Sequence, residues 1–552
     1  MRLNVVSDSS ETGLSYPDHA GRPFGYIDRF MAVPRDNVKL YVHSLAEYKI
    51  DIMRNGPAGL EEAVYSVEGR PGKQQKTEEN FNIDGANWEV TDEFWISPEW
   101  KGGLYRIRLT DINGNVNYVP LIVSDVVAGS GANQDKKPIT LITSYASWVT
   151  YNYWTLRSVY RYYPKDESTR RNQPYMSLYR PWHNNSPFRS DAPLDGTTLP
   201  GIRMKHLADI EEHFIQFLER EGYPYRVIPD IMLDINPHIL DDLDVDVLIA
   251  SGHSEYWSPE MLDTLKVYLR RGGSFINFSG NSMYRKVWIH DKKILEYKHD
   301  RAKRVPVSSL DTTRQDTGGR WINNNDGEAA IFATTLLLPT PVTGAPYEVL
   351  NKEQWMFRDV AFETKKGKLI FGRKGTDAGF VGTGASGGET DGFKNKYLPN
   401  IEGTGYEVVA RGQSINLDRR KRTLGADMLW YKHNGGGIVL SAGSTNYVTS
   451  LHSTEGDEPA KQVTRNILNY TIKGDFIAPI TTLNGSSEVT INVGESYTDA
   501  GAVCSDNEAG CEVVEVGNTV NVDKAGSYMV SYKSYDAMGN NGNVVKRSVI
   551  VQ

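Results

Sequence analysis

A histidine and a glutamate two positions apart are the first residues in this chain that suggest chemistry. His253 and Glu255 lie in the sequence GHSEYWS. Alternate residues of an extended backbone point to the same side, so both side chains can face one ligand or one metal ion. The same two side chains can also cap the helix that follows and satisfy its backbone groups. The spacing alone leaves both interpretations open.

The segments around this loop predict a β-loop-α-β unit from Val245 to Asn281. VDVLIAS is a short apolar run typical of a buried strand, and SFINFSGN predicts the next strand. Between them, Ser258 and Pro259 have the chemistry of a helix N-cap and first helical position, and two glycines end the helix. Ligands usually bind where a strand of such a unit ends, so we expect a site at His253 and Glu255.

The length and patterning of the chain predict three domains. Residues 1–130 form short β runs such as VKLYVHSL and GLYRIRLTD between turns, which predicts a β-sandwich. Residues 131–474 alternate apolar strands with helices, which predicts an α/β domain with a mainly parallel sheet. Turn-rich stretches such as GTDAGFVGTGASGGETDGF predict long loops over that domain. Residues 475–552 return to short β runs and predict an immunoglobulin-like sandwich.

The composition excludes two classes of partner. The 61 basic and 69 acidic residues give a net charge of -8 with no basic stripe, which argues against nucleic acid and anionic membranes. Polar residues interrupt every apolar run before it reaches the length of a membrane helix, so we expect no membrane span.

The two cysteines indicate the cellular compartment in which the protein acts. Cys504 and Cys511 flank SDNEAG and are close enough in sequence to pair across a loop, so we favour a disulfide over two free thiols. A disulfide indicates an oxidising compartment. The first residues lack the apolar core of a signal peptide, so the protein is either cytosolic or has lost a leader. We expect a secreted or surface protein.

Several motifs resemble the large subunit of N,N-dimethylformamidase and its relatives. The most specific is SGHSEYWSPEMLDTLKVYLRRGGSFINFSGNSMYRKV, and YNYWTLRSVY, SLYRPW, SGGETDG and GGGIVLSAGSTNYV are present in the family's order. The resemblance covers roughly residues 20 to 475. It departs from the family where the more usual YNxWGG reads YNYWTL. The remaining tail resembles bacterial immunoglobulin-like repeats of secreted and surface proteins.

The resemblance implies a mononuclear ferric iron held by two tyrosines and a glutamate. It places Glu255 as the carboxylate ligand and Tyr151 and Tyr160 as the tyrosine ligands. Tyr179 is the alternative tyrosine ligand. Phenolate and carboxylate oxygens suit a hard trivalent cation, which agrees with this implication.

The resemblance also implies hydrolysis of an amide C–N bond. It places His253 in the same site, and Glu389 of GGETDG matches a second carboxylate and candidate general base. Neighbouring residues of the same motifs are assigned to the substrate: Trp154, Tyr179, Arg180, Tyr256, Trp257 and Asn281. The substrate is then a small amide or an extracellular polymer.

Two other functions stay open at this point. The same tyrosine, histidine and glutamate groups in an aromatic groove could cleave a polysaccharide. The chain could instead be a non-catalytic carbohydrate-binding or surface protein. A homo-oligomer stays open, and so does the need for a small partner subunit like that of dimethylformamidase.

Overall fold

The computed structural model describes most of the 552-residue chain. The described residues are 22–77, 81–125, 137–152, 154, 175–182, 187–188, 207–297, 304–306, 315–317, 319–337, 342–376, 381–416, 423–473, 478–506, 510–536 and 541–552. The chain is rich in β-structure and divides into two compact units, Met1–Leu350 with Phe362–Ala460 and Asn351–Ala361 with Lys461–Gln552. The predicted domain boundaries after residues 130 and 474 fall outside the described residues and stay predictions.

The N-terminal part of the first unit contains two antiparallel sheets. The three-stranded sheet has the order β1 (Phe24–Ile27), β2 (Asn37–His43), β5 (Asp92–Trp95). The four-stranded sheet has the order β4 (Gly59–Arg70), β3 (Tyr48–Gly56), β6 (Gly103–Asp111), β7 (Val116–Val123). A short helix, α1 (Phe81–Asp84), lies between β4 and β5 in the chain.

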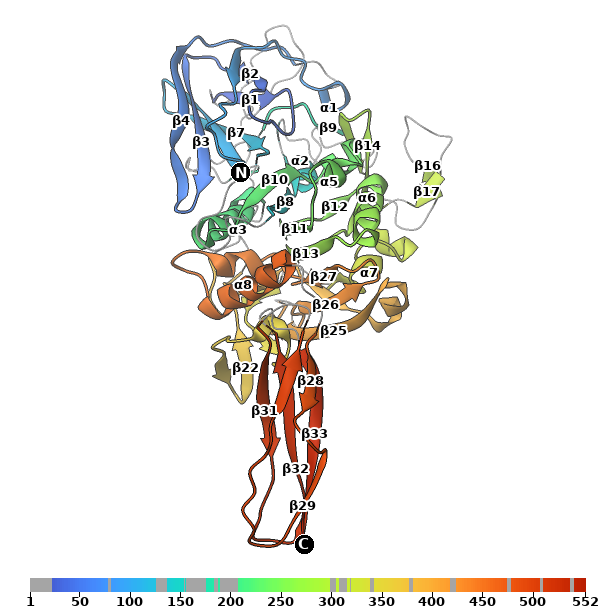
Figure 1. Ribbon diagram of the computed structural model, residues 1–552. Coiled ribbons are helices and arrows are strands. Elements are labelled where there is room, and N and C mark those ends of the chain that lie inside the picture. The colour runs from blue at the N-terminus through green and yellow to red at the C-terminus, as the bar shows by residue number, and fades with distance from the viewer. Residues whose placement is uncertain are drawn as a thin grey trace. The chain divides into compact units, whose positions relative to one another are not determined.

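A ten-stranded sheet forms the centre of the first unit (Figure 1). Its order is β10 (Tyr225–Pro229), β8 (Ile139–Thr143), β11 (Val247–Gly252), β13 (Ser274–Ser279), β27 (Ile438–Ser441), β26 (Asp427–His433), β25 (Gly403–Gly412), β20 (Tyr347–Val349), β22 (Lys368–Phe371), β21 (Glu363–Lys365). Pairing is parallel from β10 to β27 and antiparallel from β27 to β21. The sheet is therefore mixed, with parallel pairing in one half only, and the expected mainly parallel sheet is not confirmed. In the other half, short connections such as residues 434–437 join neighbouring strands, whereas a parallel pair needs a long crossover.

The helix after the GHSEYWS loop begins where the sequence predicts. Helix α6 (Pro259–Arg270) has Ser258 as its N-cap, and Ser258 Oγ accepts a hydrogen bond from the backbone nitrogen of Met261 at 3.1 Å. Its buried apolar face, at about 1.5–3 kcal/mol for each fully buried side chain, consists of Met261, Leu262, Leu265 and Leu269. Helix α6 and strands β11 and β13 thus fix both ends of the loop that carries His253 and Glu255.

The described chain also contains smaller sheets and further helices. A four-stranded sheet has the order β12 (Tyr256–Trp257), β14 (Arg285–His290), β15 (Ile294–Tyr297), β9 (Tyr175–Ser177), and three strand pairs are β16 (Arg304–Pro306) with β17 (Gln315–Thr317), β18 (Thr334–Leu336) with β24 (Asp391–Phe393), and β19 (Val342–Ala345) with β23 (Ser386–Gly388). The further helices are α2 (Tyr145–Tyr151), α3 (Ala208–Glu221), α4 (Met232–Ile235), α5 (Ile239–Asp242), α7 (Glu328–Ile331) and α8 (Glu458–Lys473), with 3-10 helices at Trp321–Asn324, Trp355–Phe357, Asn395–Asn400 and Tyr447–Leu451. None of the described helices combines the length and apolar character that a membrane crossing requires.

The second unit contains the two sheets of its β-domain. One pairs β28 (Ile480–Leu483) with β30 (Ala502–Ser505), and the other has the order β29 (Glu488–Ile491), β33 (Asn541–Val551), β32 (Gly526–Tyr535), β31 (Glu512–Asn518). Its buried core is small, with Ile491, Val530, Tyr532, Val549 and Val551 at its centre. Cys504 and Cys511 form the predicted disulfide.

Reduction of this disulfide should destabilise the second unit. The bond closes a loop with a sequence separation of 7, and removal of such a cross-link increases the entropy of the unfolded chain. We expect the free energy of unfolding of this unit to fall by about 2–3 kcal/mol, measured by calorimetry of the Cys504→Ser/Cys511→Ser variant. An unchanged transition would contradict the expectation.

Candidate functional site

The GHSEYWS loop leaves β11 through a close approach to helix α3. Gly252 has φ 78°, and a Cβ atom there would lie 2.7 Å from Cγ of Glu211. After this turn, the backbone nitrogen of Ser254 donates to Ser279 Oγ at 2.9 Å. The carbonyl oxygen of Glu255 accepts from the backbone nitrogens of Tyr284 and Arg285 at 3.0 and 2.9 Å. The loop is therefore held on both sides, and its side chains have fixed directions.

Three side chains from two distant segments of the sequence meet at this loop. His253 Nε2 lies 2.9 Å from Glu389 Oε2 and 3.4 Å from Glu255 Oε2. One ligand atom of each residue lies within 4.8 Å of those of the other two, a spacing that could hold one metal ion. Tyr151 Oη donates to Glu255 Oε2 at 3.3 Å and adds a phenol to the set. The side chains of His253 and Glu255 are 0% and 4% exposed, and that of Glu389 is 16% exposed.

A tight turn after β13 supports Glu389. Asn281 Nδ2 donates to Glu389 Oε2 at 2.7 Å. Asn281 has φ 52°, a conformation that asparagine adopts more readily than most residues. The carboxylate of Asp391 accepts from the backbone nitrogens of Asn281 and Ser282, each at 3.1 Å. A Cβ atom at Gly280 would lie 2.3 Å from the Glu389 carbonyl oxygen, so this glycine lets the two segments touch.

Helix α2, which carries Tyr151, is held at both ends by buried polar groups. At its start, Asp230 Oδ1 accepts from the backbone nitrogen of Ala146 at 3.0 Å, and Glu211 Oε1 accepts from that of Ser144 at 3.1 Å. At its end, Arg180 Nη2 donates to the carbonyl oxygens of residues 149 and 152 at 3.0 and 2.8 Å. The position of the phenol is therefore set by the protein interior.

Burial and charge together change the protonation of the cluster. Burial alone would lower the pKa of His253, but the Glu389 and Glu255 carboxylates outweigh burial and raise it. Burial also raises the pKa of the Glu255 carboxyl, against the opposing effect of His253. Arg285 Nε, 3.5 Å from Glu255 Oε1, partly balances the negative charge. The cluster thus tends to retain protons, and an imidazole in it can both hold and release one.

The comparisons with known proteins identify the family. The family model described as N,N-dimethylformamidase beta subunit-like, C-terminal, matches residues 50–461. The chain belongs to this family. A curated relative, the N,N-dimethylformamidase beta subunit of an Alcaligenes species, is 21% identical over 456 residues, which are 71% of this chain and 55% of the relative. The chain therefore spans about half the length of that dimethylformamidase subunit.

A second family model and a solved structure also match the chain. The model for an immunoglobulin-like domain of bacterial surface proteins matches residues 481–551 and confirms the predicted C-terminal domain. A solved structure, the mmIFT52 N-terminal domain, covers 48% of this chain and 91% of its own at 14% identity, with a TM-score of 0.27. That score is too low for a comparison of folds.

The site of this dimethylformamidase-like chain unites five of the residues that sequence reasoning selected. These are Tyr151, His253, Glu255, Asn281 and Glu389. Tyr256 is buried beside them, with its ring centroid 6.4 Å from that of Tyr151. Tyr160, the second tyrosine that the resemblance implied, lies outside the described residues.

Four of the residues assigned to the substrate have other surroundings. Arg180 is buried against the end of α2, as described above. Trp154 is buried, with its ring centroid 5.0 Å from that of Phe81. Trp257 is buried in the core of the first unit, and its Nε1 donates to Ser254 Oγ at 2.9 Å. Tyr179 lies beside Phe30, at 5.0 Å between ring centroids, in a separate pocket.

Sequence reasoning missed three residues that support the site. Asp391 holds the Asn281 turn, Arg285 approaches Glu255, and Glu211 holds the start of α2. Asp391 and Arg285 lie within the quoted family motifs, two and four positions from Glu389 and Asn281, and that proximity was the available signal. Glu211 gave no such signal, because a glutamate on a helix usually faces solvent.

Replacement of Trp257 tests its place in the core. We expect Trp257→Ala to lower the free energy of unfolding by about 3–5 kcal/mol, because a large buried ring is lost. Trp95→Ala is the matched control, since Trp95 is 66% exposed and its loss should change stability by less than about 0.5 kcal/mol. Chemical denaturation measures both values. Equal small effects would show that Trp257 does not stabilise the core.

The buried carboxyl of Glu211 should make stability depend on pH. Burial raises its pKa from 4.5 to about 8. The folded state therefore keeps a proton that the unfolded chain loses above pH 4.5, so this contribution is complete at low pH and is lost as the pH rises to about 8. Denaturation across this range should show a shallower decline for Glu211→Gln than for the wild type. The exposed Glu260→Gln should keep the wild-type slope, and equal slopes in all three proteins would refute the assignment.

Proposed function

We propose that the protein is a hydrolase that cleaves an amide-type C–N bond, with a mononuclear ferric ion as its cofactor. The observation that carries the proposal is the convergence of His253, Glu255 and Glu389 in a member of the dimethylformamidase-like family. The ligand atoms of these three residues come from two distant segments and lie within 4.8 Å of one another, a spacing that could hold one metal ion.

The donor set fits a hard cation. Glu255 and Tyr151 would supply carboxylate and phenolate oxygens, and their oxygen atoms already lie 3.3 Å apart. Asn281 Oδ1 is buried and accepts no hydrogen bond from the described residues, so it is available to a ligand or a water molecule. When bound, a ferric ion would polarise the substrate carbonyl and increase the acidity of a water molecule.

His253 and Glu389 are the residues we assign to proton transfer. Their atoms Nε2 and Oε2 are 2.9 Å apart, close enough to exchange a proton directly. The protonated imidazole would donate its proton to the leaving amine nitrogen. Because Glu389 is partly exposed and His253 is fully buried, Glu389 would take a proton from water and return it to the imidazole. Asn281 keeps Glu389 in reach of His253 through its 2.7 Å hydrogen bond.

We further propose that the protein acts outside the cytoplasm. The support is the match of residues 481–551 to an immunoglobulin-like domain of bacterial surface proteins, together with the disulfide in that domain. The substrate is then a small amide or an amide group on an extracellular polymer.

Elemental analysis and the visible spectrum of the purified protein test the cofactor first. A ferric tyrosinate gives a charge-transfer band, so one iron per chain with such a band is the expected result. Product analysis on formamides and N-acyl compounds, with glycans in parallel, then tests the reaction. A protein that neither contains nor takes up iron, or that releases products only from glycans, would refute the proposal.

A further inference from the structure

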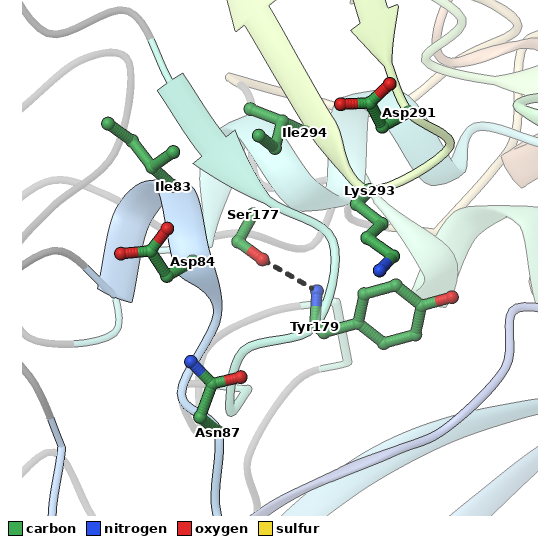
Figure 2. A pocket seen from close by; sticks show the side chains of 8 residues that line it. All are labelled: Ile83, Asp84, Asn87, Ser177, Tyr179, Asp291, Lys293 and Ile294. Carbon is green, nitrogen blue, oxygen red and sulfur yellow. Dashed lines mark hydrogen bonds between the residues drawn. The ribbon is translucent and has the colours of Figure 1, made fainter.

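A pocket lies in the first unit, away from the His253 site. It has a volume of about 630 Å³ and is lined by three separate segments (Figure 2). The segments are the end of α1 with the residues after it, the end of β9, and the turn between β14 and β15. The polar lining residues are Asp84, Asn87, Ser177, Tyr179, Asp291 and Lys293.

This pocket is distinct from the candidate active site. None of its lining residues belongs to the cluster of His253, Glu255 and Glu389. Strand β14 connects the two places, since Arg285 at its start pairs with Glu255 and Asp291 follows its end. A strand rises about 3.3 Å per residue, so the two ends are separated by roughly 20 Å.

Backbone hydrogen bonds hold together the three segments that line the pocket. The backbone nitrogen of Leu178 donates to the carbonyl oxygen of Lys293 at 2.7 Å, which ties β9 to the β14–β15 turn. The backbone nitrogen of Ala86 donates to the carbonyl oxygen of Tyr179 at 3.1 Å, which ties the segment after α1 to β9. The floor is buried at Ser177 and Ile294, whereas the charged side chains at the rim are exposed. The walls are therefore fixed before any ligand enters.

The chemistry of the lining selects the class of ligand. Two carboxylates, of Asp84 and Asp291, oppose one ammonium, of Lys293, so the net charge of -1 disfavours phosphates and other anions. These three side chains are exposed at the rim of the pocket, where a ligand can reach them. Carboxylates only accept, an ammonium only donates, and the amide of Asn87 does both. Such a mixture matches neighbouring hydroxyl groups, each of which is both donor and acceptor.

We propose that this pocket binds a neutral sugar unit. The ring of Tyr179 and the side chains of Ile83 and Ile294 line the pocket and offer apolar surface for C–H groups of a sugar, and polar side chains beside them offer partners for its hydroxyl groups (Figure 2). A volume of about 630 Å³ lies within the range of ligand sites in proteins and accommodates about one or two sugar rings. The exposed rim admits a sugar that is the end of a longer chain.

Titration of the full chain with neutral saccharides tests the proposal. The probes are cellobiose, maltose, xylobiose and N,N′-diacetylchitobiose, observed by saturation-transfer NMR and calorimetry. We expect at least one to bind. Asp84→Ala and Lys293→Met should each weaken that binding by at least tenfold, because each removes a charged hydrogen-bonding group.

Two matched variants control for nonspecific effects. Lys292→Met changes a neighbouring lysine of the same turn that does not line the pocket, and Asp263→Ala removes an exposed aspartate from helix α6. Both should bind as the wild type does. Soluble polymers of the same sugars are titrated in parallel. Tighter binding to the polymer than to the disaccharide would identify the end of a longer sugar chain as the ligand.

Three outcomes would overturn the proposal. They are no binding to any probe, binding that the pocket variants leave unchanged, and binding only to charged sugars such as glucuronic acid or glucosamine. The readout is independent of iron and of amide hydrolysis, so a failure here leaves the proposed function standing.

Discussion

Replacement of Glu255 by glutamine should remove bound iron and activity together. Glutamine keeps the size and shape of the side chain but loses the negative charge that a trivalent ion needs. Even residues that only support a metal ligand usually change metal affinity by about 10–100-fold, so loss of the carboxylate ligand itself should exceed about 100-fold. We expect purified Glu255→Gln to contain little iron and to lack the charge-transfer band.

Glu296→Gln is the matched control for this experiment. Glu296 is another buried carboxylate of the first unit, and it too is paired with a histidine, His290, at 2.7 Å. It lies outside the candidate site, so its replacement should leave iron content, colour and activity close to those of the wild type. If Glu255→Gln retains iron and the band, or if both variants lose iron alike, Glu255 is not a specific ligand.

The local unit around the site could be predicted from the sequence because its signals are strong and short in range. The apolar run of β11 and the Ser258–Pro259 start of α6 each have a single physical interpretation. That unit fixes where His253 and Glu255 lie. The sequence of that unit does not predict Glu389, which is more than a hundred positions away. Glu389 enters the site because β24 and its neighbours contact the Asn281 turn.

The mixed sheet and the roles of the aromatic residues depend on contacts that a single sequence does not encode locally. The residues of β23 and β24 lie in a glycine-rich stretch that predicts a loop, yet these short strands position Glu389 between them. Tryptophans such as Trp154 and Trp257 are common in sugar and amide sites. In this structure Trp154 packs against Phe81 and Trp257 lies in the hydrophobic core, so both contribute to packing. Density of aromatic residues is thus a poor guide to a site, because the same rings serve core packing equally well.

Replacement of His253 by glutamine should separate proton transfer from metal binding. Glutamine can still hydrogen-bond to Glu389 but cannot carry a proton, so we expect kcat to fall by about 10²–10⁴-fold while iron content and colour stay unchanged. As the acid of the proposed step, the imidazole of His253 must be protonated, so wild-type activity should decline as the pH rises through its pKa. The variant should lose this limb of the pH profile.

His290→Gln, which alters the comparable pair with Glu296, should keep both the rate and the limb. Loss of iron from His253→Gln would instead make the imidazole a ligand, and an unchanged rate and profile would exclude it from proton transfer, leaving Glu389 as the residue that must carry the proton.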